Sequence, residues 1–134
     1  MKSQIIVLDS EALSRAVSGD RHMRDLISVA RSERMMIVVP ASTLVEAIHS
    51  KTNISALMWV LSRVQVQPIT ELVARQAAEL LISASRHGHS DALDAMLIAA
   101  ALLAAGGGTP LIYASDPKDI RAIGGDAVAT VALT

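Results

Sequence analysis

The sequence contains no cysteine and almost no aromatic residues: one Trp, one Tyr and no Phe among 134 residues. The absence of cysteine excludes disulfide bonds and thiolate metal sites, so oxygen or imidazole ligands would have to hold any metal. The scarcity of aromatic side chains argues against base-stacking surfaces such as those of RNA-recognition and OB-fold domains. The hydrophobic core must therefore be built from aliphatic side chains and methionine.

The chain also lacks a long apolar run and a net charge of one sign. No apolar stretch approaches the ~18–20 residues that cross a bilayer, and the stretch that starts at Ile5 is too short for a signal peptide. We therefore expect a cytoplasmic protein with no membrane partner. With 12 basic and 13 acidic residues the formal net charge is −1, so a nucleic-acid partner would need a locally basic surface. The length favours a single domain over residues 1–134.

Short β-branched runs alternate with longer segments of helical periodicity. The predicted strands are Ile5–Leu8, Met36–Val39, Val64–Gln67, Leu111–Ala114 and Ala127–Ala132. The predicted helices are Glu11–Val17, His22–Arg34, Thr43–Ser50, Ser55–Arg63, Glu71–His87, Ser90–Ala105 and Asp116–Ile123. Strands separated by helices indicate βαβ units, and hence a three-layer α/β/α fold with a mostly parallel five-stranded sheet.

Carboxylates follow three of the predicted strands. Asp9 closes the first strand, Glu46 lies in the helix after the second, and Asp116 comes directly after the fourth. Because the carboxyl ends of parallel strands share one edge of an open sheet, where ligands bind in doubly wound folds, these three acids should converge. Asp91 and Asp94 open the alanine-rich helix instead. Nothing local shows at which end of the domain that helix begins, so the position of Asp94 stays open.

A cluster of four carboxylates would be strongly self-repelling, and is tolerated only with a bound cation or with raised pKa values. Oxygen ligands without cysteine favour Mg²⁺ or Mn²⁺. A simpler interpretation exists for most of these acids. The segment 116–119 is a good helix start, and Thr43…Glu46 and Asp91…Asp94 have the spacing of a capping box. The convergence of the set on one predicted edge favours a metal centre over separate caps.

Four acidic motifs stand in order along the chain. They are Val-Leu-Asp9-Ser, Thr-Leu-Val-Glu46 after a Val-Val-Pro strand, Asp94-Ala-Met-Leu-Ile-Ala-Ala-Ala, and Tyr-Ala-Ser-Asp116-Pro-Lys-Asp119-Ile-Arg-Ala-Ile. Together they resemble the motifs of PIN-domain ribonucleases, and the fourth is especially similar to the form found in VapC-type toxins of toxin–antitoxin pairs. The resemblance covers essentially the whole chain. It departs from the family after Glu46, where such toxins often carry an arginine and this chain has Ala-Ile-His-Ser-Lys over residues 47–51.

The resemblance implies a metal-dependent endoribonuclease that hydrolyses RNA phosphodiesters with Mg²⁺ or Mn²⁺. The residues that would hold the metal and carry catalysis are Asp9, Glu46, Asp94 and Asp116. Asp119 would be an outer acid or a helix cap, and Asp91 an auxiliary acid or a cap beside Ser90. The resemblance further implies an RNA substrate, a cognate antitoxin protein and a homodimer.

The sequence also bears on three other interpretations. A receiver domain also combines Mg²⁺ with aspartates, but it needs an aspartate after the third strand, where residues 65–69 read Gln-Val-Gln-Pro-Ile. A haloacid-type phosphatase needs an aspartate two residues after Asp9, where Glu11 stands. A catalytically silent PIN fold that serves as an interaction module remains an alternative, although the complete acid set argues against it.

Residues outside the acidic motifs have weaker indications. The basic residues that either line an RNA path or lie on solvated helix faces are Arg15, Arg21, Arg24 and Arg63. The residues expected in the core or in a dimer interface are Met35, Met36, Met58 and Trp59. The apolar helices expected to pack on a second copy or on an antitoxin helix are Leu72–Ile82 and Ile54–Leu61.

Overall fold

Five parallel strands form the centre of the molecule. The structure is a computed structural model and describes residues 4–133. Its strands are β1 (Ile5–Leu8), β2 (Met36–Pro40), β3 (Gln65–Gln67), β4 (Leu111–Ala114) and β5 (Ala129–Ala132). They are hydrogen-bonded in the order β3-β2-β1-β4-β5, and every neighbouring pair is parallel. The predicted five-stranded sheet is therefore confirmed.

Helices connect all the strands. They are α1 (Ser10–Val17), α2 (Arg21–Ser32), α3 (Ala41–Ala47), α4 (Ile54–Leu61), α5 (Glu71–Ser83), α6 (His89–Ala105) and α7 (Pro117–Gly124), followed by the short 3-10 helix η1 (Gly125–Ala127). Several begin with polar side chains that accept a hydrogen bond from a free backbone N–H of the first turn, namely Asp9, Asp20, Asn53 and Thr70. None of the helices in the described part of the chain is long and apolar enough to span a membrane.

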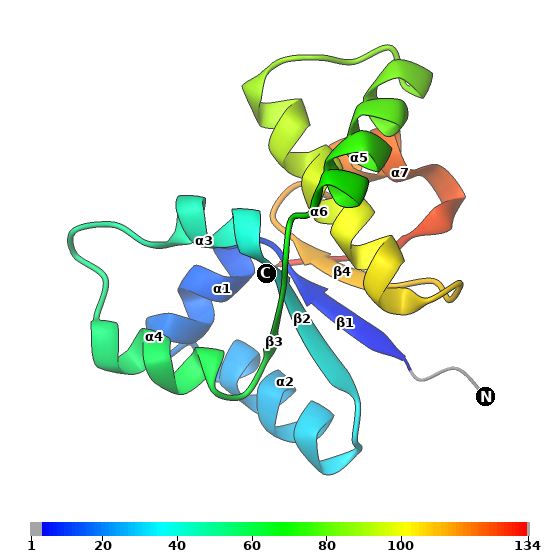
Figure 1. Ribbon diagram of the computed structural model, residues 1–134. Coiled ribbons are helices and arrows are strands. Elements are labelled where there is room, and N and C mark those ends of the chain that lie inside the picture. The colour runs from blue at the N-terminus through cyan, green and yellow to red at the C-terminus, as the bar shows by residue number, and fades with distance from the viewer. Residues whose placement is uncertain (1–3, 134) are drawn as a thin grey trace.

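The helices cover both faces of the sheet, which makes the fold the three-layer arrangement that the sequence predicts (Figure 1). On one face the core joins β1 and β2 to α1, α2 and α4, through residues such as Leu8, Leu13 and Ile27. On the other face it joins the sheet to α5, α6 and α7, through residues such as Val7 and Ile98. Because side chains alternate along a strand, the neighbours Val7 and Leu8 enter opposite cores.

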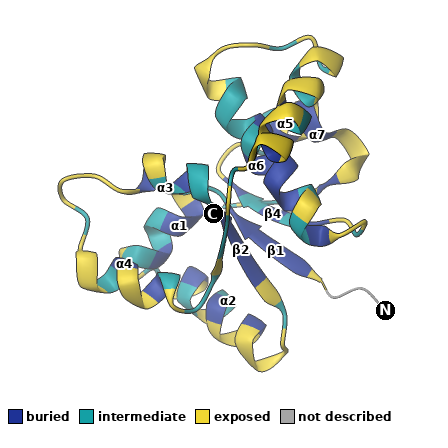
Figure 2. Cartoon of the chain, in the orientation of Figure 1, coloured by how far each residue is buried: buried dark blue, intermediate teal, exposed yellow. Residues whose placement is uncertain are grey.

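Helix α6 is the most buried helix, and its alanines explain why. Seven of its residues are buried, including the run Ile98–Ala101, and it packs against both α5 and the sheet. Small side chains let the helix approach these neighbours closely, and Gly106, with φ +56°, ends it in the left-handed conformation that glycine adopts freely. Buried residues are concentrated in the strands and in α6 in Figure 2, while α2, α4 and α5 have exposed outer sides.

Element boundaries differ from the predicted ones by a few residues. The helix predicted over Thr43–Ser50 begins at Ala41, and the helix predicted to His87 ends at Ser83. Residues 125–127 form η1, so the last strand is shorter than predicted. Met36 and Met58, expected in the core or in a dimer interface, have exposed fractions of 41% and 59%, so the core is excluded for them and the interface stays a prediction.

The strand order defines where a ligand would be expected. Strands β1, β2 and β3 proceed to one side of the sheet, and β4 and β5 to the other, so the order reverses between β1 and β4. In open parallel sheets, ligands bind outside the carboxyl ends of the two strands at such a reversal. Here these are the ends at Leu8 and Ala114, and each is followed within two residues by an aspartate.

Candidate metal centre

Asp9 joins the ends of β1 and β4. Its backbone N–H donates to the carbonyl of Tyr113 at 3.1 Å, which continues the pairing of the two strands. Its carboxylate accepts from the backbone N–H of Ala12 through Oδ1 at 2.8 Å and from the backbone N–H of Ser115 through Oδ2 at 2.8 Å. The Ser115 hydroxyl lies 3.3 Å from the same Oδ2 atom. These bonds hold the carboxylate at the reversal of strand order, and Oδ1, which accepts a single hydrogen bond, keeps a further lone pair for a ligand.

Glu46 and Asp94 come from two helices that meet at this edge. Glu46 is an exposed residue near the end of α3, which starts directly after β2. Asp94 is a partly buried residue in the second turn of α6, and α6 packs against α3. Helix α6 therefore begins at the carboxyl edge of the sheet, which answers the question that the sequence left open.

Asp116 and Asp119 follow β4. Asp116 stands at the position before the first turn of α7, but its side chain makes no capping hydrogen bond and is exposed. Pro117 occupies the first helical position, where a missing backbone N–H costs nothing. Asp119 lies two residues further into the first turn and is partly buried. The carboxylate of Asp116 is thus not used to start the helix.

The four acids predicted to form the metal centre line one cleft, and Asp119 lines it too. The cleft has a volume of about 170 Å³. Its walls carry five carboxylates, four serine hydroxyls and Thr43, and its lining residues are Asp9, Ser10, Ser42, Thr43, Glu46, Ser90, Leu93, Asp94, Leu97, Ser115, Asp116 and Asp119. Two larger cavities, of about 400 and 510 Å³, lie elsewhere and contain none of these acids. The chemistry, rather than the size of the cavity, marks this cleft as the candidate site.

The PIN domain family model matches residues 6–124, which is most of the chain. The chain belongs to the PIN domain family. The resemblance inferred from the four acidic motifs is therefore confirmed at the level of the family. No curated protein matches the sequence.

The fold is similar to that of several solved structures. A chain of VapBC2 from Rickettsia felis, bound to a DNA fragment from their promoter, matches with a TM-score of 0.74 and 14% identity, over 98% of this chain and 100% of that one. A chain of FitAB bound to an IR36 DNA fragment matches with a TM-score of 0.63 and 17% identity, over 95% and 94%. FitAcB from Neisseria gonorrhoeae gives 0.56 and 17%, over 93% and 95%. At such identities the likeness establishes the fold.

Asp94 shows that the acids of this PIN domain influence one another. Its pKa is raised from the ordinary 3.8 to about 6, mainly because burial disfavours the charged carboxylate. Repulsion from Asp119, Glu46, Asp91 and Asp9, in decreasing order, raises the pKa of Asp94 further. Asp119 and Asp91 are therefore electrostatically part of the site, although Asp91 does not line the cleft.

The donor set suits a hard divalent cation in type and in charge. All the ionisable groups in the cleft are carboxylates, the ligands that Mg²⁺ and Mn²⁺ prefer, and a cation would relieve the repulsion around Asp94. Within residues 4–133, however, no three histidine or acidic side chains are close enough together to form a ready-made coordination sphere. The residues thus fit a metal that binds through few carboxylates and keeps water ligands, as Mg²⁺ does.

The capping interpretations of these acids are wrong for most of them. Helix α3 starts at Ala41, so Thr43 lies inside it and is buried rather than capping it with Glu46. Helix α6 starts after Gly88 without any side-chain cap, so Asp91 does not cap it. Among the acids that line the cleft, Asp9 does cap a helix, and the sequence signal for it is an aspartate just before Ser-Glu-Ala-Leu.

Some residues of the cleft were missed at the sequence level. The serines next to the acids, such as Ser10 and Ser115, line the cleft, and Ser115 bonds Asp9 directly. Arg86 was also missed: its Nη1 atom lies 3.4 Å from Asp91 Oδ1 and 3.5 Å from Asp119 Oδ1. The sequence predicts a helix over Glu71–His87 that would include it, whereas in the structure α5 ends at Ser83 and Arg86 lies in the connection to α6, so only the structure brings it to these acids.

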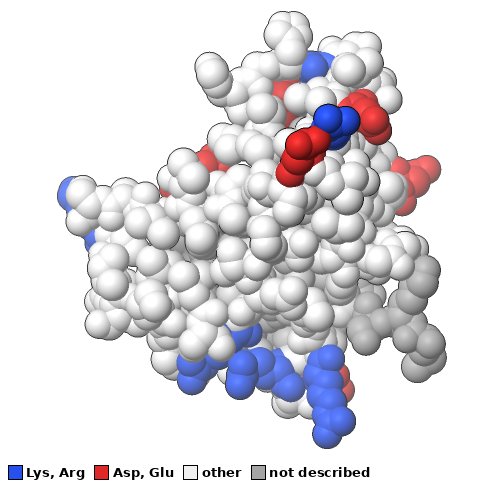
Figure 3. Space-filling view, in the orientation of Figure 1, with Lys and Arg blue, Asp and Glu red and all other residues white. Residues whose placement is uncertain are grey.

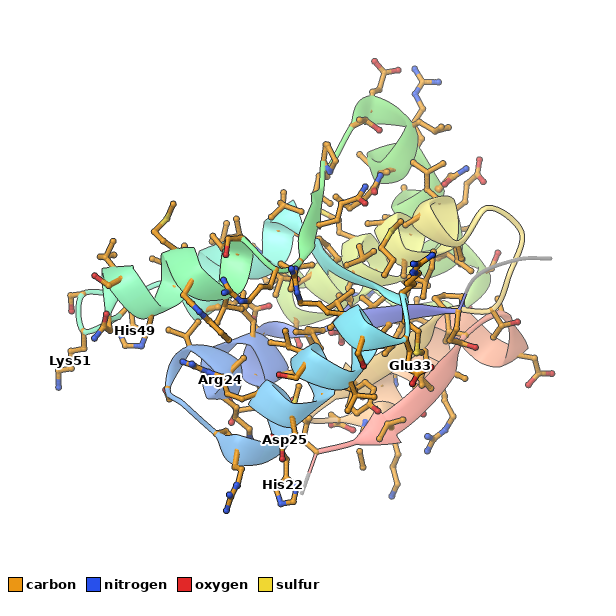
Figure 4. All side chains as sticks on the ribbon, turned by 90° about the horizontal axis from the view of Figure 1, so that it is seen from below. His22, Arg24, Asp25, Glu33, His49 and Lys51 are labelled. Atoms are coloured by element: carbon orange, nitrogen blue, oxygen red, sulfur yellow. The ribbon has the colours of Figure 1, made fainter. Side chains whose placement is uncertain are left out.

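One group of basic side chains lies away from the cleft. In Figure 3 this group is at the lower end of the view, in the region of α2 and the neighbouring end of α4, while other basic side chains are at the left edge and the top. In this group the guanidinium carbons of Arg24 and Arg63 lie 4.4 and 4.0 Å from the ring centroid of Trp59. Figure 4 labels Arg24 on α2. Trp59 is 36% exposed, so the expectation that it belongs to the core is wrong, while its place in an interface is untested.

Proposed function

We propose that this PIN domain is a metal-dependent endoribonuclease and the toxin component of a type II toxin–antitoxin pair. The observation that carries the proposal is the convergence of Asp9, Glu46, Asp94 and Asp116 on one polar cleft at the reversal of strand order. PIN domains are generally nucleases, and this chain belongs to that family. The VapBC2 and FitAB structures, which pair a chain of this fold with a second protein, support an antitoxin partner.

In the proposed mechanism the carboxylates of the cleft hold the cation and orient the attacking water. Asp9, fixed by its hydrogen bonds to Ala12 and Ser115, provides a rigid carboxylate at the floor of the site. Asp94 and Glu46, on facing helices, would bind the cation directly or through the water ligands that it retains, and would orient one of these waters for in-line attack on the phosphodiester. Mg²⁺ or Mn²⁺, when bound, would lower the pKa of a coordinated water and neutralise phosphate charge.

Surface features support protein partners, which we propose as an antitoxin and a second copy of the chain. Large apolar side chains are exposed on α4 and α5: Ile54 at 60%, Met58 at 59%, Leu72 at 52% and Ile82 at 78%. These are the two apolar helices singled out in the sequence. Light scattering of the purified chain measures the proposed homodimer directly, and a monomeric mass would contradict it.

RNA cleavage by the purified protein tests the nuclease. We expect cleavage of labelled RNA with Mg²⁺ or Mn²⁺ and none with EDTA. Asp94→Asn should reduce the rate by about a hundredfold or more, because losing one carboxylate of a metal site costs several kcal/mol of transition-state stabilisation. Asp126→Asn is the matched control, since Asp126 is an exposed acid on η1 outside the cleft.

The alternative outcomes separate the nuclease from the silent interaction module. If wild-type protein neither cleaves RNA nor binds Mn²⁺ in calorimetry, the nuclease proposal fails and the module takes its place. Asp94→Asn is preferred over Asp9→Asn as the decisive variant. Asp9 also holds β1, β4 and α1 together through its hydrogen bonds, and its loss would affect folding as well as chemistry.

A further inference from the structure

Arg86 lies in a tightly shaped connection between α5 and α6. Its backbone N–H donates to the carbonyl of Leu81 at 2.9 Å, and Ser85 before it has a φ of +55°, a conformation that side chains rarely adopt. Gly88, with φ +111°, follows and leads into α6. The backbone around Arg86 is therefore held in a specific turn, which directs its side chain toward the starts of α6 and α7.

The side chain of Arg86 meets carboxylates from two different helices. A single atom, Nη1, lies 3.4 Å from Oδ1 of Asp91 and 3.5 Å from Oδ1 of Asp119. Asp119 lines the acidic cleft, and both acids contribute to the raised pKa of Asp94. Arg86 thus places a positive charge at the rim of a cleft that is otherwise negative.

These two ion pairs hold Arg86 only loosely. Their distances exceed the 2.7–2.9 Å of a good charge-assisted hydrogen bond, and the three side chains are 34%, 24% and 42% exposed for Arg86, Asp91 and Asp119. Within the described structure, Nε and Nη2 of Arg86 make no hydrogen bond. A guanidinium group can present two parallel N–H donors to a phosphate, so Arg86 retains most of its binding capacity.

From this geometry we infer that Arg86 binds a phosphate of the substrate strand at the rim of the cleft, with Asp91 and Asp119 positioning it. The assignment rests on the nuclease function proposed above. A polyanion that approaches five carboxylates is repelled by them, and a net charge of −1 provides no general attraction. A cation beside the cleft offers the strand a contact next to the bond that is cut, apart from any metal.

A purely structural role for Arg86 predicts different behaviour. If it only ties the connection to α7, Arg86→Ala loosens the site and weakens both metal and nucleic-acid binding. If it is a phosphate contact, the same change weakens nucleic-acid binding but strengthens metal binding, because a positive charge leaves the neighbourhood of the carboxylates. Arg86→Lys distinguishes the effect of the positive charge from that of the guanidinium geometry, since lysine keeps the charge and lacks the two parallel N–H donors.

The test measures binding rather than turnover. The probe is a short fluorescein-labelled 2′-O-methyl oligoribonucleotide, titrated with Ca²⁺ present at several salt concentrations and followed by fluorescence anisotropy. Arg86→Ala should weaken binding about fivefold, the scale of one charge-assisted contact at a half-exposed position. It should also reduce the salt dependence, the slope of log K against log salt, by about 0.7, the value for one phosphate contact on a single strand.

Mn²⁺ binding, followed by electron paramagnetic resonance, provides the second measurement. Arg86→Ala should bind Mn²⁺ more tightly, by about twofold or more. Arg75→Ala is the matched control, because it removes the same charge from α5. Among residues 4–133 Arg75 pairs with Glu71 alone, at an exposed position, so this change should alter neither quantity. Arg86→Lys should restore the salt slope but only part of the affinity.

Two results would overturn the inference: unchanged oligonucleotide binding in Arg86→Ala, or a parallel loss of oligonucleotide and Mn²⁺ affinity. Wild-type protein that does not bind the probe at all would do the same. Each of these outcomes is compatible with a wild-type enzyme that cleaves RNA, so the nuclease proposal survives them. Absence of both cleavage and Mn²⁺ binding in the wild type would instead remove the proposed function itself.

Discussion

The molecule has two charged regions in which the charges have opposite surroundings: the arginines around Trp59 and the carboxylates of the cleft. Around Trp59, the guanidinium groups of Arg24 and Arg63 each face the aromatic ring, and Arg24 Nε also donates to the carbonyl of Ala16 at 2.7 Å. Each charge there meets a complementary group. In the acidic cleft, carboxylates face other carboxylates, and the pKa of Asp94 rises to about 6. The contacts of the two arginines with Trp59 stabilise the fold. The repulsion among the carboxylates of the cleft destabilises it, and a bound cation would relieve that repulsion.

Trp59→Ala should give the largest change in stability and test the first half of this comparison. Removing the ring takes away the surface between α2 and α4 on which both arginines lie, and we expect the free energy of unfolding to fall by about 2 kcal/mol, less than for a fully buried tryptophan. Urea unfolding with EDTA measures the loss. RNA cleavage at a temperature where both proteins are folded should be unchanged.

Trp59→Phe is the matched control, because it keeps an aromatic face for Arg24 and Arg63 and should recover part of the lost stability. A Trp59→Ala protein that is as stable as the wild type would show that the stacked arginines do not support the fold. Loss of cleavage in a folded Trp59→Ala protein would show that the region belongs to the functional surface.

Asp94→Asn should act in the opposite direction and stabilise the metal-free protein. The folded-state pKa of about 6 exceeds the ordinary 3.8, so between these values the folded protein binds more protons than the unfolded chain. Stability therefore falls as pH rises through this window. Asparagine does not ionise, and we expect a gain of about 1 kcal/mol at pH 7.5 after allowing for solvent screening, and little gain near pH 4.

Urea unfolding in EDTA at the two pH values measures this gain, with Asp126→Asn as the control. Mn²⁺ should reverse the order at pH 7.5, because a ligand that binds only the folded protein stabilises it and Asp94→Asn would bind it poorly. A variant less stable than the wild type at pH 7.5 without metal would contradict the electrostatic cost that we assign to the cleft.

The sequence predicted much of this fold because its information is local. The run Ile5–Leu8 is apolar throughout, as a strand buried on both faces is. Proline and glycine mark the ends of several elements, among them Gly106. The short strand Gln65–Gln67 falls within the strand predicted over Val64–Gln67, although two of its three residues are polar.

The site was less predictable because it depends on contacts between distant segments. The position of Asp94 follows from the packing of α6 against α3, α5 and the sheet, and no pattern within α6 encodes it. Asp116 looked like a helix cap, yet its side chain makes no capping bond, whereas Asp9 caps α1 and contacts Ser115 more than a hundred positions later. Local rules describe which acids can cap a helix, and tertiary structure decides which do.

The smallest expected effect concerns the contribution of each neighbour to the pKa of Asp94. Repulsion from Asp119 is the largest electrostatic cause of the shift and exceeds that from Glu46, while burial outweighs both. Asp119→Asn and Glu46→Gln should therefore each lower the pKa of Asp94, by about half a unit or less, with the larger decrease in Asp119→Asn. Neither should bring it back to 3.8, because the burial remains.

Carbon-13 NMR titration of the Asp94 carboxyl group, without metal, measures both decreases against wild type and Asp126→Asn. A pKa that stays at about 6 in both variants would mean that burial alone perturbs Asp94. The cleft would then differ from the region around Trp59 because a carboxylate is removed from water, and not because like charges lie close together.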